Sequence, residues 1–403
     1  MKNLLILSQY FWPENFQINS VAENLIKKKD IKVHVFTGLP NYPSGKIPAK
    51  YKYINKLYTE KYKNIKIYRC PIYPRKDSNF LNLCLNYLSF VFYGIRYFKD
   101  LNINKKIDHI LTYSTSPITA NLPAIYLKKK YNKKLSIWVQ DLWPDSVKST
   151  GYIKNSFLIF LINLLVKFIY HSADQLFIPS VKFKKKILEK INNKKIFYVP
   201  NSSFNYKKKR KINIELLKKF KGKNYFVYAG NLGKAQSIEN ILKAALILKD
   251  ISDVIFIIIG DGSEKSKLLK FKKDNDLKNV FFTGSLNFET IQIISKHSKA
   301  TIISLADDKL FNNYIPNKFQ NSLVANRPII FSGKGVIREI IIKNKIGLTS
   351  KPEKINDLVK NVLKINKLSK FERNNMIRRC KKLYTNEFSN NAQIEKLRKY
   401  MNL

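Results

Sequence analysis

The stretch PNKFQNSLVANRPII, residues 316–330, decides the fold because it passes from a helix directly into a strand. Its first proline suits a helix entrance, and Phe319 and Leu323 fall one turn apart on one face. Asn326 stands where a left-handed residue ends a helix, and the Arg-Pro pair after it forces extension. The apolar run 329–331 is then typical of a strand covered on both faces in a parallel sheet.

Three polar residues at this junction, Lys318, Gln320 and Asn321, allow two interpretations. Ligands of α/β proteins bind at borders between strands and helices, so these side chains could form a binding site. On these residues alone, the solvated face of a helix is the simpler interpretation.

Apolar strands and helical patterns alternate along both halves of the chain, which is the βαβ signature of parallel sheets. In the first half, the predicted strands are residues 4–7, 33–36, 110–112, 135–139 and 175–178. In the second half, they are residues 226–228, 254–259, 280–283, 301–304 and 329–331. The pattern predicts an α/β protein with two Rossmann-like domains facing a cleft.

The sequence also predicts where these domains begin and end. We expect the N-terminal domain at residues 1–200 and a polar, basic linker at residues 201–222. The C-terminal domain would span residues 223–380, and residues 381–403 would form a helix that returns to the N-terminal domain.

The composition indicates a folded and strongly basic protein. Of 403 residues, 45% are hydrophobic and 13% aromatic, well above the range of disordered chains, although the net charge is +47. Lysines are scattered through almost every segment, and such a surface attracts anionic lipid head groups and polyanions. Because no zinc-finger spacing, basic-aromatic RNA signature or zipper accompanies the charge, we favour a membrane surface over nucleic acid.

The cysteines and the apolar segments bear on the compartment. Cys70, Cys84 and Cys380 are too few and too far apart for a disulfide framework or a metal cage, so we expect a reducing cytoplasm. The start of the chain, MKNLLILSQYF, turns polar by Ser8 and predicts a first strand rather than a signal peptide. The most apolar segment, residues 157–170, has about 14 residues and is too short to span a bilayer.

Glycines follow the first two strands of the second half. Gly230 and Gly233 lie in YAGNLGKAQ, and Gly260 and Gly262 lie in IIGDGSE, each time between an apolar strand and a helix. Small residues at such turns let backbone N–H groups approach an anion near a helix N-terminus. Neither turn has the G-x-G-x-x-G or P-loop pattern, which argues against nicotinamide or ATP. Gly233 taken alone is equally compatible with a plain turn.

Seven motifs follow one another along nearly the whole chain: SQYFWPENF, TGLPNYPSGK, WVQDLWPDS, GNLGKAQ, GDGSE, FTGSL and PNKF with SLVANRP. Their order resembles the bacterial family 4 glycosyltransferases, and most closely the branch of L-fucosamine transferases of O-antigen and capsule assembly. The resemblance implies the GT-B fold, with a nucleotide sugar held by the C-terminal domain and the acceptor by the N-terminal domain. It further implies retaining transfer from a UDP-sugar, which is favoured as donor, with no cofactor and no essential metal.

The resemblance also implies partners and a location. The donor sugar would be N-acetyl-L-fucosamine or a related amino sugar, and the acceptor a polyprenyl-diphosphate-linked saccharide. Such an acceptor lies in a membrane, so the enzyme would be cytoplasmic and peripheral on the inner membrane, bound to its anionic surface and not to nucleic acid.

On the donor side, Gly230, Asn231 and Gly233 match the family's diphosphate-contacting turn, and Gln236 follows the branch pattern. Lys234 supplies one of the basic residues usual there. The further donor-binding candidates are Gly260, Gly262, Lys318 and Asn321.

The donor side also departs from the family. Asn231 and Ala235 occupy positions that are often basic, and Lys318 could supply the missing charge. Asn313 and Asn321 replace two glutamates of the broad family. A carboxylate can accept from both ribose hydroxyls, whereas an amide offers one acceptor, so ribose recognition should differ here. With the resemblance added, we interpret Lys318 and Asn321 as site residues.

In the first half, Gln140 and Asp141 stand where many relatives carry His-Asp at the end of a strand. A glutamine can bind sugar hydroxyls but cannot act as a base. Glu14 is a further candidate for holding substrate hydroxyls, although isolated acids also occur as capping or surface residues. The predicted acceptor-side residues are Asn15, Phe16, Asn41 and Tyr42.

Two alternatives to glycosyl transfer stay open at this point. A nucleotide-sugar 2-epimerase has a similar fold, but its paired acids and histidine are not evident among only four His. A nucleic-acid-binding protein would explain the charge directly.

Two apolar, aromatic segments, residues 79–98 and 157–170, are candidates for contact with a membrane surface. The alternative interpretation is that both helices are simply part of the core.

Overall fold

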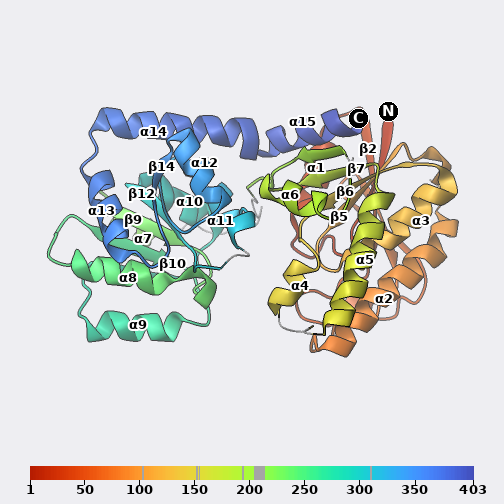
Figure 1. Cartoon of the computed structure of the whole chain (residues 1–403), viewed down its shortest axis with the longest axis horizontal. Helices are drawn as coiled ribbons and strands as arrows, with labels where there is room; N and C mark the ends of the chain where they lie inside the picture. Colours follow the sequence, from red (N-terminus) through yellow and green to blue (C-terminus); the bar gives the residue numbers. More distant parts are fainter. Residues whose placement is uncertain (102–103, 151–152, 154, 193–194, 204–213, 309–310) are drawn as a thin grey trace. The chain divides into compact units, whose positions relative to one another are not determined.

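The computed structural model describes residues 1–101, 104–150, 153, 155–192, 195–203, 214–308 and 311–403. The chain forms two compact units: residues 1–200 with 393–403, here the N-terminal unit, and residues 201–392, here the C-terminal unit. Each unit contains one sheet with helices packed around it (Figure 1). The predicted pair of Rossmann-like α/β domains is therefore confirmed.

The N-terminal unit is built on an eight-stranded sheet. Its strands are β1 (Lys2–Leu7), β2 (Ile31–Gly38), β3 (Tyr58–Tyr62), β4 (Ile65–Cys70), β5 (His109–Ser114), β6 (Lys134–Val139), β7 (Gln175–Ile178) and β8 (Lys195–Tyr198). Their order is β3-β4-β2-β1-β5-β6-β7-β8, and only β3 runs antiparallel to its neighbour. The chain order reverses between β1 and β5, so the loops that leave the carboxyl ends of these central strands occupy the usual ligand position.

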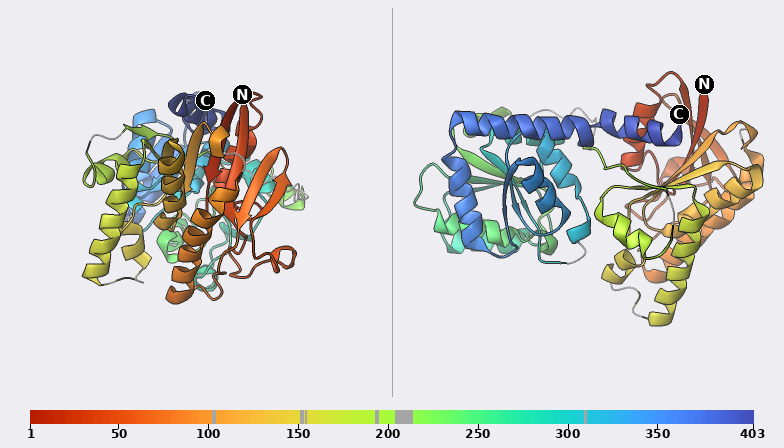
Figure 2. Two further views of the ribbon diagram at one scale, coloured as in Figure 1. Left: turned by 90° about the vertical axis from the view of Figure 1, so that its right-hand side faces the viewer. Right: turned by 45° about the horizontal axis from the view of Figure 1, so that its top comes forward.

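Helices cover both faces of this sheet. They are α1 (Gln17–Leu25), α2 (Phe80–Tyr97), α3 (Leu122–Tyr131), α4 (Asp145–Thr150), α5 (Ser156–Ser172), α6 (Lys182–Leu188) and most of α15 (Asn390–Met401). On one face, α1 and α15 pack against the buried side chains of β1, among them Leu4 and Ile6. On the other face, Phe36 of β2 packs against Phe90 of α2, and α3 contacts both α2 and α5. Figure 2 shows α2, α3 and α5 in front of the sheet in its left view.

The C-terminal unit is built on a six-stranded, fully parallel sheet. Its strands are β9 (Tyr225–Ala229), β10 (Ile255–Ile259), β11 (Val280–Gly284), β12 (Ala300–Ser304), β13 (Ile329–Ser332) and β14 (Gly347–Ser350), in the order β11-β10-β9-β12-β13-β14. The chain order reverses between β9 and β12, which makes their carboxyl ends the expected ligand position.

Helices again form two layers in this unit. They are α7 (Ile214–Lys219), α8 (Ile238–Ile247), α9 (Lys265–Asp274), α10 (Phe288–His297), α11 (Asn317–Val324), α12 (Val336–Asn344), α13 (Ile355–Asn366) and α14 (Lys370–Leu383). Apolar residues of α8, α9 and α13 share one core with the sheet, and those of α11, α12 and α14 share another.

The junction at residues 316–330 has the predicted conformation. Helix α11 is followed by Asn326 with a φ of +51°, and the residues of β13 are all buried. The left-handed asparagine ends the helix, and the proline that follows it starts the extended chain.

Four strands were not predicted, namely β3, β4, β8 and β14. Alternating exposure in β3, with the sequence YTEKY, gives it little apolar character, and β8 and β14 have only four residues each. Short edge strands of this kind carry a weak periodic signal.

The domain boundaries also differ in part from the expected ones. Of the predicted linker, residues 204–213 lie outside the described residues, whereas residues 214–219 form α7 and Phe220 is buried. The C-terminal unit continues to residue 392 rather than 380. From residue 393 the chain belongs to the N-terminal unit, where Ile394 and Leu397 join its core.

The two apolar helices α2 and α5 are not simply part of the core. On α2 the exposed large apolar side chains are Phe80, Leu81, Leu85, Leu88 and Phe92; on α5 they are Phe157, Leu158, Phe160, Leu161, Leu164 and Phe168. Each helix buries only three residues. The interpretation of both helices as core is therefore wrong. Among the described residues, no helix is long and apolar enough to cross a membrane.

Candidate functional site

The glycine turns after β9 and β10 lie against one another in the C-terminal unit. The Gly230 N–H donates to the carbonyl of Ile259 at 2.9 Å, and the Leu232 N–H donates to the carbonyl of Asp261 at 2.8 Å. Gly260 has a φ of +145°, and a Cβ added there would overlap the carbonyl oxygen of Gly230.

These glycines have a structural role in the C-terminal unit. They let neighbouring turns approach each other, and the N–H groups of Gly230 and Gly260 donate to backbone carbonyls. Gly262 follows the same rule, since its added Cβ would lie 2.6 Å from the Leu232 carbonyl oxygen. The N–H groups of Gly230 and Gly260 are thus already bonded, and the approach of the turn's backbone to an anion stays a prediction.

Lys318 supplies a cation at this edge. Its ammonium group donates to the hydroxyl of Tyr228, above whose ring it lies at 4.6 Å from the centroid. The Tyr228 hydroxyl in turn donates to the carbonyl of Asn231 at 2.7 Å. Burial lowers the pKa of Lys318 to about 7, so the approach of an anion would favour its charged form. Sequence reasoning missed Tyr228, although it lies two residues before Gly230.

A cavity of about 180 Å³ opens beside Lys318 at the reversal point between β9 and β12. It is lined by Gly230, Lys318, Asn321, Gln292 and Thr301, among others. Asn321 Oδ1, Gln292 Oε1 and Thr301 Oγ1 are buried and form no hydrogen bond with any described residue. Buried polar atoms are rarely left without a partner, so these three mark a place suited to a polar ligand.

The other donor-side candidates surround the first turn. The Asn231 Nδ2 donates to Gln236 Oε1 at 3.2 Å, and a Cβ at Gly233 would lie 2.8 Å from the same Nδ2. Lys234 is exposed, and Asn313 ends a short 3-10 turn. The structure thus places Gly230, Asn231, Gly233, Gln236 and Lys318 along one edge.

In the N-terminal unit, Glu14 joins two loops. Its carboxylate accepts hydrogen bonds from the backbone N–H groups of Asn41 at 2.8 Å, Tyr42 at 2.7 Å and Phe11 at 3.3 Å. Burial raises the pKa of Glu14 to about 7 despite these bonds. The contacts give Glu14 a role in holding the loops after β1 and β2 together, and its action on substrate hydroxyls stays a prediction.

Aromatic rings cluster above these two loops. Phe16 stacks on Tyr10 with 5.1 Å between ring centroids, and Tyr42 lies 5.2 Å from Phe16. The guanidinium of Arg75 lies 5.2 Å from the centroid of the Tyr42 ring. Rings that combine exposed faces with a cation are suited to contact sugar rings and phosphate.

The predicted acceptor-side residues meet in this cluster only in part. Phe16 and Tyr42 belong to it, Asn15 is exposed, and Asn41 is buried. The Asn41 Oδ1 accepts from the Arg75 N–H at 3.2 Å and from Asn86 Nδ2 at 3.3 Å.

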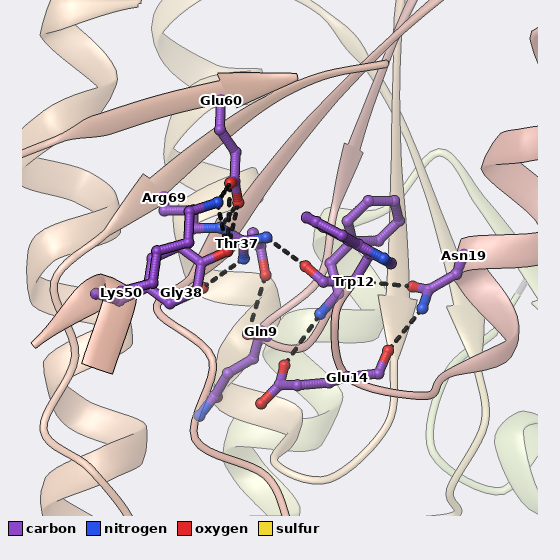
Figure 3. A network of polar contacts seen from close by, with 11 residues as sticks. Gln9, Trp12, Glu14, Asn19, Thr37, Gly38, Lys50, Glu60 and Arg69 are labelled. Carbon is purple, nitrogen blue, oxygen red and sulfur yellow. Dashed lines mark hydrogen bonds and ion pairs between the residues drawn. The ribbon is translucent and has the colours of Figure 1, made fainter. Parts of the chain in front are cut away.

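A buried ion pair is hydrogen-bonded to the loop after β1. Arg69 pairs with Glu60 and donates to the carbonyl oxygens of Trp12 and Gly38, as Figure 3 shows. The carboxylate of Glu60 also accepts from Lys50 at 2.7 Å. Because the Arg69 side chain is fully buried, removing Glu60 would leave its charge without this partner. Neither residue stands in a recognisable motif, so the sequence offered no signal for this pair.

Gln140 and Asp141 follow β6, which is separated from β1 by β5. The Asp141 Oδ2 accepts from the Ser116 N–H at 2.9 Å and from the Ser116 hydroxyl at 3.0 Å. Burial raises the pKa of Asp141. The Ser116 hydroxyl accepts from Trp143 Nε1 at 3.1 Å, so the motif WVQDLWPDS is tied to the loop after β5.

Comparisons with known proteins address the activity. Residues 209–383 match the family described as Glycosyl transferases group 1. The chain is 25% identical to the "probable glycosyltransferase WbjE" of Pseudomonas aeruginosa over 70% of its length and 72% of the relative. It is 23% identical to WcaI of Escherichia coli K12, a glycosyl transferase assigned to colanic acid biosynthesis, over 66% of both chains.

A solved structure supports the fold over the whole chain. The E. coli trehalose-6-phosphate structure bound with UDP-2-fluoro glucose has a TM-score of 0.72 and 10% identity, and the match covers 100% of this chain and 99% of that one. These findings favour glycosyl transfer over the epimerase and nucleic-acid alternatives. Residues 209–383 thus match the group 1 glycosyl transferases, and the protein is a glycosyltransferase of GT-B fold.

Proposed function

We propose that the protein transfers a sugar from a UDP-sugar, with retention of configuration, to a lipid-linked saccharide in the synthesis of a surface polysaccharide. The observation that carries the donor assignment is the edge formed by Lys318, Gly230 and Asn321 beside a cavity with unpartnered polar atoms. The E. coli structure named above contains a UDP-sugar analogue, and WcaI is assigned to a polysaccharide pathway.

The reaction needs a stabilised leaving group more than a strong base. The bond from the sugar C1 to the β-phosphate oxygen breaks, and the acceptor oxygen bonds to C1 on the same face. The acceptor proton passes to the departing phosphate. Charge therefore develops on the diphosphate, where the Lys318 ammonium would stabilise it.

Asn321 would contact the ribose through its amide. Its buried Oδ1 accepts no hydrogen bond from a described residue, so it can accept one from a ribose hydroxyl. We further propose N-acetyl-L-fucosamine or a related amino sugar as the transferred group, which rests on the resemblance of the motifs alone.

The lipid-linked acceptor implies contact with a membrane. Leu81, Leu85, Leu88 and Phe92 of α2 follow the spacing i, i+4, i+7, i+11 and form one exposed stripe. On α5, Phe157, Leu161, Leu164 and Phe168 form a second stripe with the same spacing. The exposed Lys129 of α3 lies over the ring of Phe168 at 5.6 Å, which places a cation beside an exposed apolar side chain. Shallow insertion of these stripes into an anionic surface would give reversible attachment.

The proposed donor chemistry is tested with a panel of UDP- and GDP-sugars. In the absence of acceptor, we expect slow hydrolysis of one UDP-sugar, which proton NMR can monitor. The first sugar released should have the anomeric configuration of the donor. Hydrolysis of none of the panel, or release of the opposite anomer, would contradict the proposal.

A further inference from the structure

An apolar groove of about 590 Å³ runs beside helix α2 in the N-terminal unit. Its lining includes Ile54, Ile72, Pro74, Leu85, Leu88 and Phe92. Three of these side chains belong to the exposed face of α2, and Phe92 is 65% exposed. The volume lies within the range of sites for small molecules, and the lining suits a hydrocarbon chain.

Cations stand at one end of the segment that lines this groove. Tyr73 and Pro74 line the groove, and Arg75 and Lys76 follow directly. The ammonium of Lys76 lies 4.8 Å from the centroid of the Tyr73 ring. The neighbouring acid, Asp77, accepts hydrogen bonds from the Asn79 and Asn82 side chains. An apolar groove whose lining segment continues into two cations complements a molecule with a hydrocarbon tail and an anionic head.

Hydrogen bonds connect the groove with the aromatic cluster of Tyr10, Phe16 and Tyr42. The Asn86 Nδ2 donates to the carbonyl of Tyr73 and to Asn41 Oδ1 at 3.3 Å. The same Asn41 oxygen accepts from the Arg75 N–H. Arg75 therefore connects the two places, since its guanidinium lies over Tyr42 and it directly follows Pro74 of the groove lining.

We propose that this groove binds the first isoprenoid units of a polyprenyl phosphate or diphosphate, with the phosphate held by Arg75 and Lys76. This inference rests on the proposed function, because it assigns the tail of the lipid-linked acceptor to a site. Phosphate at Arg75 would place the attached saccharide next to the Tyr42 and Phe16 rings. A bilayer alone does not call for such a groove, because a stripe of exposed side chains is sufficient for insertion.

The test measures binding of farnesyl diphosphate by isothermal titration calorimetry, at a concentration below micelle formation. We expect it to bind at least tenfold more tightly than inorganic diphosphate or farnesol, because each of these lacks one half of the interaction. Lys76→Gln should weaken binding of farnesyl diphosphate and of inorganic diphosphate by similar factors of about three to ten.

A matched pair of variants separates the groove from general apolar contact. Phe92→Ser and Leu81→Ser each remove an exposed apolar side chain from α2, with exposures of 65% and 66%, but only Phe92 lines the groove. We expect Phe92→Ser to weaken farnesyl diphosphate binding about tenfold and to leave inorganic diphosphate binding unchanged. Leu81→Ser should change neither by more than about twofold. Thermal unfolding of both variants checks that the fold is kept.

Equal losses in the two variants, or no preference for farnesyl diphosphate over inorganic diphosphate, would overturn the inference. Because this binding needs no donor and no transfer, its failure is separate from failure of the proposed activity. If vesicle binding falls in both variants while farnesyl diphosphate binding falls in neither, α2 contacts lipid without a specific groove, and the inference is also wrong.

Discussion

The side chain of Lys318 lies directly over Gly230, so that a Cβ added at the glycine would meet Lys318 Nζ at 2.9 Å and overlap its Cε. The two residues stand 88 positions apart in the sequence and act together. The missing side chain at the end of β9 leaves room for a partly buried ammonium group at the reversal point of the sheet. This arrangement explains why a glycine is needed there even though its N–H group is taken by a backbone carbonyl.

Gly230→Ala should therefore impair donor binding by displacing Lys318. We expect a loss of UDP affinity of about tenfold and a loss of unfolding free energy of about 1–3 kcal/mol, since the glycine also has a φ of +153°. Gly284→Ala is the control, because Gly284 has a φ of +71° and an added Cβ would meet nothing within 4 Å. Calorimetric titration of UDP and thermal unfolding measure both effects. A similar loss of UDP affinity in both variants would exclude displacement of Lys318 as the cause.

The affinity for UDP should depend on pH through Lys318. Its pKa of about 7 means that the side chain is mostly charged below pH 7 and mostly neutral above it. The affinity for UDP should then fall by about tenfold as the pH rises from 7 to 8.5, because the free protein loses the proton of Lys318 and must take it up again to bind the anion. Lys318→Ala should lack this fall. Because protonation of the UDP phosphate affects both proteins alike, this variant is also the control for the titration of UDP itself. Parallel pH profiles for the two proteins would show that Lys318 is not the titrating group.

Asn321 should recognise the ribose. If its Oδ1 accepts from the 2′-hydroxyl, Asn321→Ala should weaken UDP binding about three- to tenfold and bring 2′-deoxy-UDP binding close to that of UDP. Titration of both nucleotides into both proteins completes a double-mutant cycle. Additive losses would mean that this side chain and this hydroxyl do not meet.

The apolar stripe on α5 should contribute to binding of anionic membranes. We expect the protein to co-sediment with phosphatidylglycerol vesicles at low salt, to be released as ionic strength rises and not to bind neutral vesicles. Phe157→Ser with Phe168→Ser should lower the bound fraction several-fold, because both side chains are exposed members of this stripe. Replacing Phe371 by serine is the control, since this exposed phenylalanine belongs to the C-terminal unit. Equal binding to neutral and anionic vesicles would contradict the claim.

The fold was accessible from the sequence because its signals are local. Asn326 marks the end of α11, and buried apolar runs such as residues 255–259 mark central parallel strands. These signals need only neighbouring residues, since a helix end selects a residue that tolerates a positive φ and a strand buried on both faces selects an unbroken apolar run. The edge strand β3 alternates between partly buried and exposed residues, so its hydrophobic pattern in the sequence is weak.

The candidate site was accessible only where a motif carried it. The contact of Lys318 with Tyr228 joins residues 90 positions apart, and the pair of Arg69 with Glu60 depends on the pairing of β3 with β4. Such contacts arise from the packing of strands, which a single sequence does not specify. The exposed faces of α2 and α5 were ambiguous for a related reason: both helices are apolar almost all round, so periodicity could not separate buried from exposed positions.

The most direct test of the donor site compares sugar-nucleotide hydrolysis by the native protein, Lys318→Ala and the surface control Lys343→Ala, using the UDP-sugar that the native protein hydrolyses. We predict that Lys318→Ala lowers kcat/KM by about ten- to a hundredfold, the scale of a lost charge-assisted contact to the leaving diphosphate, and that Lys343→Ala changes it by less than twofold. If Lys318→Ala leaves both kcat at saturating donor and kcat/KM at subsaturating donor unchanged, the assignment of the diphosphate to the edge formed by Lys318 and Gly230 is contradicted.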